Sequence, residues 1–510
     1  MTHPKTMRGS ALVAVAVAFL LAGCNTSASQ WQPTTPELKI LYNIEEEEAG
    51  KSGVAQVVQT QLAKAGIAAT LDPVSNAVFY ERLGTGNFQC ALVMLYLDSV
   101  DPEGFLTDSY SKSGFRLSKY ESSEYDQAYL SSLLADTPVK KRDRFMAAHR
   151  ILMKDLPWVP LYSNSEQFLL APGAEEFSSN AYQYYDYRRI KRENIRAASN
   201  VEVQTFDPAL VHDLASKHLA MQSYEGLVTL DDKLQTVPGL AESWEFSRNN
   251  DRLSFNLRKG VKFHGNWGDF SSWDVRASFE RMLLHKSPYA YIFDHVRGVD
   301  EFKSKKAAHV GGFVVESANR FTIELKEPFP AMLNWLLAPA AFVLPAKLED
   351  KYDFGIGSVG TGPFVLTSWD GTLAVLKANP EYWGKDEDGA AFPRAKWLSI
   401  RMMKQASAAL TAFQQGELDV LNLPLALHGE VFDKTGQVEG AYSKYKLRVV
   451  PLNNLKFLAF RMGVDAWGTD PALRQRVSDS IDRNSIVKTL FHGKARVARG
   501  IIPQMDGTIR

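Results

Sequence analysis

The two ends of this chain carry the same alternating pattern of strands and helices, whereas its middle does not. Short apolar stretches alternate with amphipathic ones from Leu38 to Leu169, and this alternation returns after Pro393. Between Asn194 and Pro393, short strand-like stretches dominate. Strands alternating with helices are typical of an α/β body with a parallel or mixed sheet. The pattern therefore predicts either three domains or one α/β body that is built from both chain ends.

Individual stretches support this interpretation. LKILYN (38–43) predicts a strand, and the following amphipathic stretch predicts a helix that ends at Gly66. FQCALVMLYL (88–97) is a continuous apolar run, which is expected for a strand covered on both faces. In the middle region, Ser271, Ser272 and Asp274 cluster at the start of a predicted helix.

Length and charge narrow the possible functions. A chain of 510 residues can bury a large core, and its length suggests two or more domains. The 58 basic and 58 acidic side chains cancel, so no global field directs the protein to nucleic acid or to a membrane surface. After residue 24 no apolar stretch is long enough to span a bilayer.

The N-terminus has the features of a secretory signal over residues 1–23, because a short basic region precedes the apolar run ALVAVAVAFLLAG. The run ends in LAGC, which resembles a bacterial lipoprotein box. This resemblance implies cleavage before Cys24, lipidation of its thiol and acylation of the new amine. Residues 24–37 then predict a flexible tether rich in Ser, Thr and Pro. The alternative is an ordinary signal peptide with an incidental cysteine.

The second cysteine, Cys90, has no partner for an internal disulfide once Cys24 carries lipid. It lies within the apolar run at 88–97. A buried and unreactive thiol is therefore expected.

Motifs for catalysis and cofactor binding are absent from the sequence. Gly355, Gly357 and Gly360 have the G-x-G-x-x-G spacing, but Pro363 and a strand follow them where a dinucleotide site requires a helix. A tight glycine turn is the better interpretation. No G-x-S-x-G, H-E-x-x-H or paired C-x-x-C motif occurs, and the ten histidines show no metal-ligand spacing. We therefore predict that the protein is not an enzyme and holds no cofactor or metal.

One short unit does indicate binding chemistry. In YLDSVDPEGFL (96–106), Asp98 follows a buried strand and precedes an Asp-Pro loop. A carboxylate at the carboxyl end of a sheet strand can face a crevice and hold a cationic group. The alternative is that Asp98 only caps the loop that follows.

Many stretches from Phe206 onward together resemble the peptide/nickel type of extracytoplasmic solute-binding protein, the receptors of oligopeptide and dipeptide ABC transporters. These stretches occur in order along the chain: FDPALVHDLASKHLAMQSYEGLV, PGLAESWEFS, LSFNLRKGVKFH, FSSWDVRASFERM, VGTGPFVLTSW, NPEYWG, QQGELDV, LRQRVSDSIDRNSIV and GIIP. The resemblance covers nearly the whole chain after the tether.

The order of the segments is rotated relative to that family. The strand resembling NIRAAS (194–199) opens the family's mature proteins, whereas segments resembling KILYN and LPWVPLYS close them; here the closing part comes first. The resemblance implies an α/β, two-lobed, type II periplasmic-binding-protein fold with a hinged ligand cleft, in circularly permuted form. One lobe is expected to comprise residues 38–163 plus 396–510, and the other residues 164–395 as a continuous insertion. The family helix between the GIIP and KILYN segments has no clear counterpart.

The resemblance also implies a function. The protein is expected to be a periplasmic lipoprotein of a Gram-negative bacterium that binds peptides between its lobes and delivers them to ABC permease subunits. Asp98 matches the family residue that holds the α-ammonium of the peptide. Relatives often carry a Trp three residues before it; Leu95 stands there in this chain and Tyr96 is next, so the aromatic wall is expected to be weakened or moved. The backbone of Ser199, Asn200 and Val201 matches the segment that pairs with the peptide. The alternatives are a signalling or scaffold lipoprotein that keeps the fold, or a receptor for nickel, haem or another solute.

Overall fold

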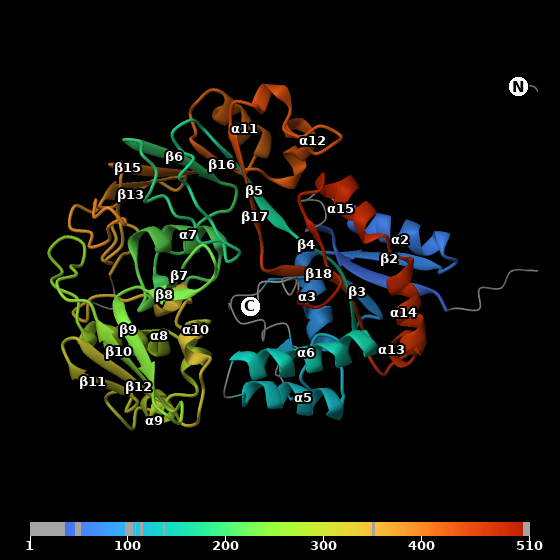
Figure 1. Ribbon diagram of the computed structural model, residues 1–510, viewed down its shortest axis with the longest axis horizontal. Coiled ribbons are helices and arrows are strands. Elements are labelled where there is room, and N and C mark those ends of the chain that lie inside the picture. The colour runs from blue at the N-terminus through green and yellow to red at the C-terminus, as the bar shows by residue number, and fades with distance from the viewer. Residues whose placement is uncertain are drawn as a thin grey trace, which may run out of the picture.

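The computed structural model describes residues 36–45, 53–96, 106–107, 109–112, 116–135, 138–348 and 352–502. The chain forms two bodies that lie side by side (Figure 1). We call residues 36–163 with 454–502 the small body and residues 165–451 the large body. A six-stranded sheet forms the centre of the small body, and the large body holds a seven-stranded, a four-stranded and a two-stranded sheet among the described residues.

The six-stranded sheet combines strands from both chain ends in the order β19-β4-β18-β3-β1-β2. β3 pairs in parallel with β1 and antiparallel with β18, where Asn454 lies opposite Tyr96 and Phe460 opposite Cys90. The strands are β1 (Leu38–Asn43), β2 (Ala69–Val74), β3 (Cys90–Tyr96), β4 (Trp158–Ser163), β18 (Asn454–Phe460) and β19 (Arg496–Val497). The first and last stretches of the described chain thus complete a single sheet.

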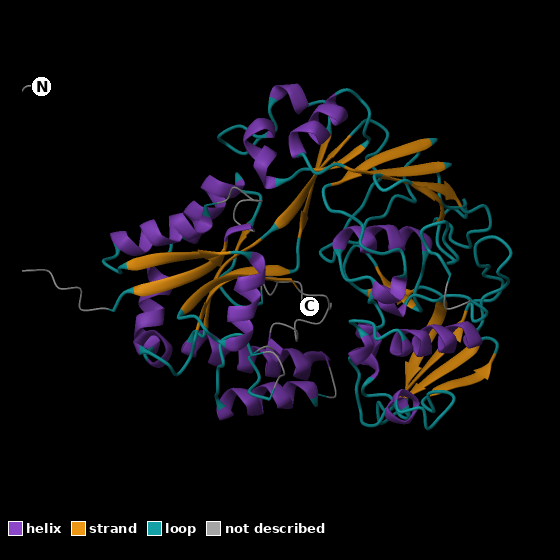
Figure 2. Ribbon diagram, turned by 180° about the vertical axis from the view of Figure 1, so that it is seen from behind, coloured by secondary structure: helices purple, strands orange, loops and turns teal. Residues whose placement is uncertain are grey.

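Helices cover both faces of this sheet (Figure 2). Cys90 and Leu92 of β3 pack into one hydrophobic cluster, and Ala91 and Val93 pack into the cluster on the opposite face. The helices are α2 (Val54–Lys64), α3 (Asn76–Thr85), α5 (Ser123–Leu133), α6 (Pro138–Asp155), α13 (Ala466–Thr469), α14 (Pro471–Ser480) and α15 (Arg483–Phe491). The prediction of a strand buried on both faces is confirmed, and so is the buried thiol of Cys90.

The seven-stranded sheet has the order β13-β14-β15-β6-β16-β5-β17. Its strands are β5 (Ser165–Leu170), β6 (Asn194–Ser199), β13 (Phe364–Trp369), β14 (Leu373–Ala378), β15 (Trp397–Met402), β16 (Val420–Asn422) and β17 (Lys446–Pro451). Helices α11 (Ala406–Gln414) and α12 (His428–Val431) lie in the same part of the chain.

This sheet corrects the predicted boundary between the lobes. Residues 396–451 were expected to join the small body, but β15 pairs in parallel with β6 over six residue pairs, and β17 pairs with β5. The prediction was wrong because the strand–helix alternation after Pro393 shows that these stretches belong to an α/β body without showing which of two such bodies holds them.

The remainder of the large body carries a four-stranded antiparallel sheet, β11-β12-β10-β9, and a hairpin, β7-β8. The bounds are β7 (Val228–Leu230), β8 (Thr236–Pro238), β9 (Ala241–Phe246), β10 (Arg252–Leu257), β11 (Phe313–Ser317) and β12 (Arg320–Glu324). Its helices are α7 (Leu214–Ser223), α8 (Ser272–Leu284), α9 (Val299–Lys303) and α10 (Met332–Trp335). The predicted start of α8 is confirmed, because Ser271 and Asp274 form a capping box there.

Two short crossings join the bodies. β4 continues into β5 through Asn164, and β17 continues into β18 through Leu452 and Asn453. The crossings are bonded to each other: the Asn164 amide donates to Asn454 Oδ1 at 2.8 Å, and the Leu452 amide donates to the Asn164 carbonyl at 2.9 Å. Two such adjacent crossings form a narrow connection about which the bodies can bend.

The glycine run before β13 is a turn, as predicted. The described residues 352–363 contain no helix. A Cβ on Gly360 would lie 2.1 Å from the Ser223 carbonyl oxygen, and one on Gly362 would lie 2.7 Å from the Gln222 carbonyl oxygen. These glycines therefore let the turn approach the last residues of α7 closely.

Candidate ligand-binding site

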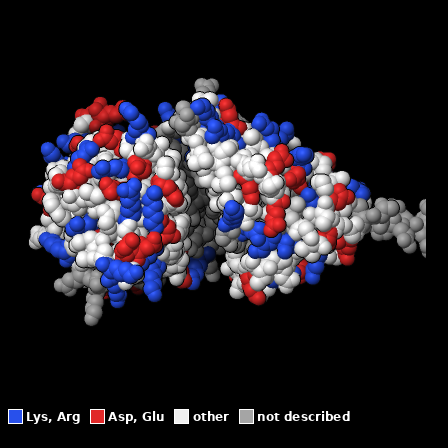
Figure 3. Space-filling model, turned by 90° about the horizontal axis from the view of Figure 1, so that it is seen from below, with Lys and Arg blue, Asp and Glu red and all other residues white. Residues whose placement is uncertain are grey.

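A deep groove separates the two bodies when the molecule is viewed from below (Figure 3). A cavity of about 300 Å³ lies between residues of both bodies. We call it the tyrosine cavity. Tyr96, at the end of β3, is its contribution from the small body; the other lining residues belong to the large body and are Tyr182, Gln183, Tyr184, Val211, His212, Asp213, Leu214, Lys217, Leu230, Tyr289, Leu337, Ala338 and Pro339.

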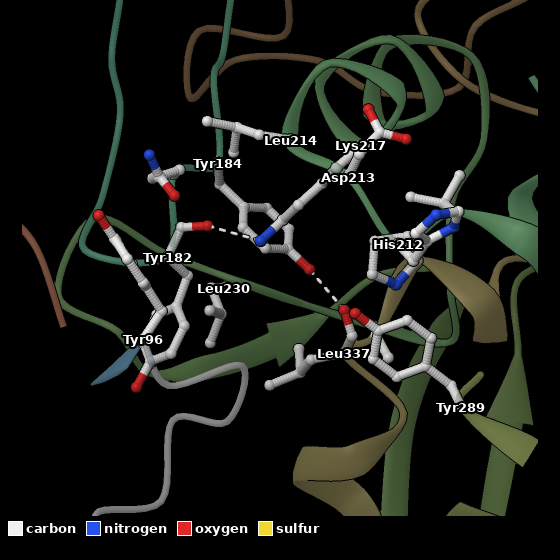
Figure 4. Close-up of a pocket in the computed structure, with 14 residues that line it drawn as sticks. Tyr96, Tyr182, Tyr184, His212, Asp213, Leu214, Lys217, Leu230, Tyr289 and Leu337 are labelled. Carbon is white, nitrogen blue, oxygen red and sulfur yellow. Dashed lines mark hydrogen bonds between the residues drawn. The ribbon is translucent and has the colours of Figure 1, made fainter. Parts of the chain in front are cut away.

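Four tyrosines give the cavity its character (Figure 4). The Tyr184 hydroxyl donates to the Leu337 carbonyl at 2.6 Å, which fixes its ring across the cavity. The Lys217 ammonium donates to the Tyr182 carbonyl at 2.8 Å and lies 5.6 Å from the centre of the Tyr184 ring. Aromatic faces with a nearby cation are suited to a ligand that has both apolar and anionic groups.

Helix α7 places the polar residues of the site. Asp213 caps its N-terminus, where one carboxylate oxygen accepts from the Ser216 amide at 2.8 Å. The other carboxylate oxygen, Oδ2, is buried and has no hydrogen-bond partner in the structure. Lys217 follows one turn later, so the same helix presents a carboxylate and an ammonium to one cavity.

Residues 171–193, which we call the bridge segment, link β5 to β6 and carry two of the tyrosines. The Asn453 amide donates to the Ala181 carbonyl at 3.1 Å, and Asn453 Nδ2 donates to the Tyr182 hydroxyl at 2.5 Å. The bridge segment is anchored by its own core residues, including Phe177 and Tyr187. One of the two crossings is thus hydrogen bonded directly to the wall of the tyrosine cavity.

Buried titratable groups lie behind this wall. Glu166 Oε1 accepts from the Tyr185 hydroxyl at 2.5 Å and from Gln183 and Asn422 at 2.9 Å each, and burial raises the pKa of the Glu166 carboxyl. The His218 ring stacks on Tyr185 at 3.6 Å between centres, and burial lowers its pKa well below the usual value. In both groups, burial shifts the protonation equilibrium toward the neutral form relative to water.

The predicted ligand residues do not all lie at the tyrosine cavity. Tyr96 lines the tyrosine cavity and is 54% exposed. Asp98 and Cys24 lie outside the described residues. Ser199 ends β6, and the Ser199 hydroxyl accepts from the Val201 amide at 3.2 Å. Neither these two nor Asn200 lines the tyrosine cavity, so their pairing with a peptide stays a prediction.

The sequence patterns did not indicate Tyr182, Tyr184, Lys217 or Tyr289 as ligand residues. The first two lie in the stretch AYQYYDY (181–187), for which no binding role was predicted. Its density of tyrosines was a usable signal, since tyrosine is common where an apolar wall also needs a polar edge. By contrast, Tyr224 and Glu225 have structural roles: Tyr224 is buried, and Glu225 accepts from Thr361, Tyr382 and Trp383.

Comparison with known families decides the affiliation. Residues 235–508, more than half of the chain, match the family described as bacterial extracellular solute-binding proteins, family 5 Middle. The chain belongs to this family. Membership confirms the predicted family and the mixed α/β binding-protein fold, and it confirms that the chain is not an enzyme, because this family consists of binding proteins.

Individual relatives match only in part. The oligopeptide-binding protein OppA of Bacillus subtilis is 25% identical over 317 residues, which is 60% of this chain and 56% of OppA. The glutathione-binding protein GsiB of Salmonella choleraesuis is 27% identical over 304 residues, 59% of this chain and 54% of GsiB. The chain thus spans about half the length of the curated relatives it matches. Among solved structures, the Escherichia coli murein tripeptide binding protein MppA superposes with a TM-score of 0.42 at 22% identity, over 48% of each chain.

Proposed function

We propose that this protein is the solute-binding lipoprotein of an ABC importer, and that it binds peptides in the tyrosine cavity and delivers them to the permease. One observation carries the proposal: the cavity is assembled from both bodies, with Tyr96 of the small body facing residues of the large body. A ligand held there contacts both sides of the groove. It therefore stabilises the arrangement in which the bodies are close together.

The two crossings allow the bodies to bend relative to each other, as closure around a ligand requires. Both are one to two residues long and hydrogen bonded to each other, so bending is confined to a small region. Asn453 bonds to Tyr182, which links movement at the crossing to the cavity wall. Closure around a peptide would give the permease a distinct shape to recognise.

Ligand contacts are proposed as follows. The carboxylate of Asp98, which follows β3 and Tyr96 in sequence, holds the peptide ammonium through charge-assisted hydrogen bonds. The rings of Tyr96, Tyr184 and Tyr289 contact peptide side chains. The backbone of Ser199–Val201 would pair with the peptide main chain only after closure, since these residues do not line the cavity now.

We also propose that the family fold is circularly permuted in this chain. Support comes from β6, which resembles the opening strand of the family and begins only at Asn194, and from the six-stranded sheet that both chain ends share. The proposed lobes are the small and large bodies defined above. Their boundary lies at the crossings, at residue 164 and at residues 452–453, instead of at residue 395.

Membrane anchoring through lipid on Cys24 completes the proposal. It rests on the LAGC sequence and on the Ser/Thr/Pro-rich tether of residues 24–37. No helix in the described part of the chain is long and apolar enough to cross a membrane. The protein would then act in the periplasm, held to a membrane by its acyl chains.

Native mass spectrometry of the protein purified from a bacterial periplasm tests the proposal. Co-purifying short peptides are the expected result, and Asp98→Asn should reduce their retention at least about tenfold by removing a charged partner. Asp232→Asn, on the large body outside the tyrosine cavity, is the matched control and should retain peptide. A protein that is always empty, even after incubation with a mixture of peptides, would contradict the proposed function and favour a scaffold role.

A further inference from the structure

A second cavity, of about 600 Å³, lies within the small body, and no described residue of the large body lines it. We call it the arginine cavity. Its lining residues come from the stretch before α5, the end of α6, the region after β18 and the start of α14. Figure 1 labels these elements. The lining residues are Arg116, Lys119, Tyr120, Glu121, Asp155, Arg461, Met462, Gly463, Gly468, Thr469, Pro471 and Arg474.

Three cations in this cavity have no carboxylate oxygen within 4 Å among the described residues: Lys119, Arg461 and Arg474. Each donates only to backbone carbonyls. Lys119 donates to Gly84 at 3.2 Å, Arg461 to Met462 at 2.7 Å, and Arg474 to Trp467 at 2.7 Å and to Asp155 at 2.6 Å. Carbonyl oxygens orient a cation without neutralising its charge.

Of the three cations, Arg474 is the most costly to keep charged, because it is only 2% exposed. Its burial lowers the pKa of the guanidinium, which reports the cost of holding a charge there. The carboxylate of Asp155 lies in the same cavity but accepts from the Tyr120 hydroxyl at 2.5 Å, and Arg474 uses only the Asp155 backbone. The carboxylates of Asp155 and Asp470 attract the Arg474 guanidinium from a distance, but among the described residues neither forms an ion pair with it. Buried charges in proteins are normally paired, so Arg474 is without a direct anionic partner here.

A further donor group in the cavity lacks a partner. The Nε of Arg461 is buried and makes no hydrogen bond within the structure. By contrast, Arg116 pairs with Glu121 at 3.0 Å and Glu121 is largely exposed, so that pair resembles an ordinary surface ion pair. The cavity therefore offers two guanidinium groups and an ammonium to one ligand.

We infer that the arginine cavity binds a phosphate-type oxyanion. Guanidinium groups present N–H donors in a planar fork that matches the oxygens of phosphate, and an ammonium adds a point charge. The open volume admits an anion with a substituent. This site is separate from peptide binding and does not depend on the proposed solute.

The path of the chain indicates where such an anion would come from. Trp467, beside the cavity, donates through its indole Nε1 to the Glu37 carbonyl at 3.3 Å, immediately before β1. Glu37 lies only 13 positions after Cys24, and a chain of that length spans at most about 45 Å. If Cys24 carries lipid as proposed, this face is held near the membrane. We therefore assign the oxyanion to the phosphate of an anionic phospholipid headgroup, a choice of source that rests on the proposed anchor.

Calorimetric titration of the full lipidated chain in neutral detergent with inorganic phosphate tests the site itself. Saturable binding is expected, weakened at least about tenfold in Arg461→Gln and measurably in Lys119→Gln, because each loses a charged donor. Arg474→Gln removes bonds that also hold Trp467, so it is the less informative variant. Lys326→Gln, on the large body, is the matched control and should bind phosphate normally. Absence of binding, or binding equal in all variants, would overturn the site.

Hydrogen exchange in nanodiscs separates the two sources of phosphate. Amides of residues 461–474 should be protected in phosphatidylglycerol discs relative to phosphatidylcholine discs, where choline shields the phosphate. Arg461→Gln should lose this protection and Lys326→Gln should keep it. Phosphate binding in solution without any disc-dependent protection would overturn the lipid assignment and identify free phosphate as the ligand. Either result is independent of whether peptides bind in the tyrosine cavity.

Discussion

The tyrosine cavity and the arginine cavity differ in what the protein leaves unsatisfied. In the tyrosine cavity, the Tyr184 hydroxyl and the Lys217 ammonium both bond within the protein, and aromatic faces remain available. In the arginine cavity, the guanidinium groups of Arg461 and Arg474 donate to backbone carbonyls and pair with no carboxylate of the described residues. The first cavity needs both bodies, whereas one body suffices for the second. Motion about the crossings should therefore change ligand binding in the tyrosine cavity and leave binding in the arginine cavity unchanged.

The largest effect is expected from Gly360→Ala. The new methyl group would lie 2.1 Å from the Ser223 carbonyl oxygen at the end of α7, and backbone cannot yield as a side chain can. We expect the free energy of unfolding to fall by about 3 kcal/mol or more. Peptide binding should weaken with it, since α7 builds the tyrosine cavity, while phosphate binding by the folded fraction should persist.

Urea unfolding followed by tryptophan fluorescence measures this change. Gly440→Ala is the matched control, because its new methyl group would meet nothing within 4 Å and the change should be nearly neutral. Equal stability of the two variants would show that the turn does not hold α7 in place.

Acidification should destabilise the large body through His264. Its ring is buried and bonds to Ser358 and to the Gly362 carbonyl at 3.0 Å, and burial lowers its pKa to about 4 from 6.5. Because the folded pKa is depressed, the stabilisation is complete above pH 6.5 and is lost as the pH falls from 6.5 to about 4. The loss amounts to about 3 kcal/mol for one such histidine.

Comparison with His264→Gln isolates this contribution. The free energy of unfolding should drop less for the variant than for the unaltered protein between pH 7 and pH 4.5. His212→Gln, at an exposed position, should behave like the unaltered protein. Identical pH profiles for all three proteins would refute the assignment to His264.

Asn454→Ala should loosen the link between the bodies. Asn454 Oδ1 accepts from the Asn164 amide at 2.8 Å, so the change leaves a donor in the crossing without its partner. A cost of about 1–3 kcal/mol is expected. Small-angle scattering should show a broader range of shapes, with peptide binding reduced and phosphate binding unchanged. Asn256→Ala, at an exposed side chain of β10, serves as the control. If the scattering of Asn454→Ala is indistinguishable from that of the control, the result would argue against the proposed bending point.

The smallest effect is expected from Tyr184→Ala. Losing one aromatic wall should weaken peptide binding about tenfold, which corresponds to about 1.4 kcal/mol. Tyr80→Ala, at an exposed position on the small body, should not weaken it. Titration with a short peptide that carries a bulky apolar side chain is the measurement, and unchanged affinity would remove Tyr184 from the site.

Local sequence patterns predicted several features correctly because each depends on neighbouring residues alone. The unbroken apolar run of β3 requires cover on both faces, and Ser271 with Asp274 can satisfy the free amides of the α8 N-terminus. The glycines at 355, 357 and 360 similarly indicated a turn, because a proline and a strand follow them. These predictions were confirmed in the structure.

Features that depend on contacts between distant segments could not be predicted from the sequence patterns. The assignment of β15 to the seven-stranded sheet depends on its pairing with β6, just over 200 residues away, and an apolar strand pattern fits either sheet equally well. The tyrosine cavity likewise brings Tyr96, Tyr184 and Tyr289 together from three separate stretches. Sequence determined the elements, their caps and the family, since these follow from local chemistry and motif order. Only tertiary structure decided which strands share a sheet and which side chains share a cavity. Those contacts join residues that are far apart in the chain, and the local sequence around each residue does not identify its partner.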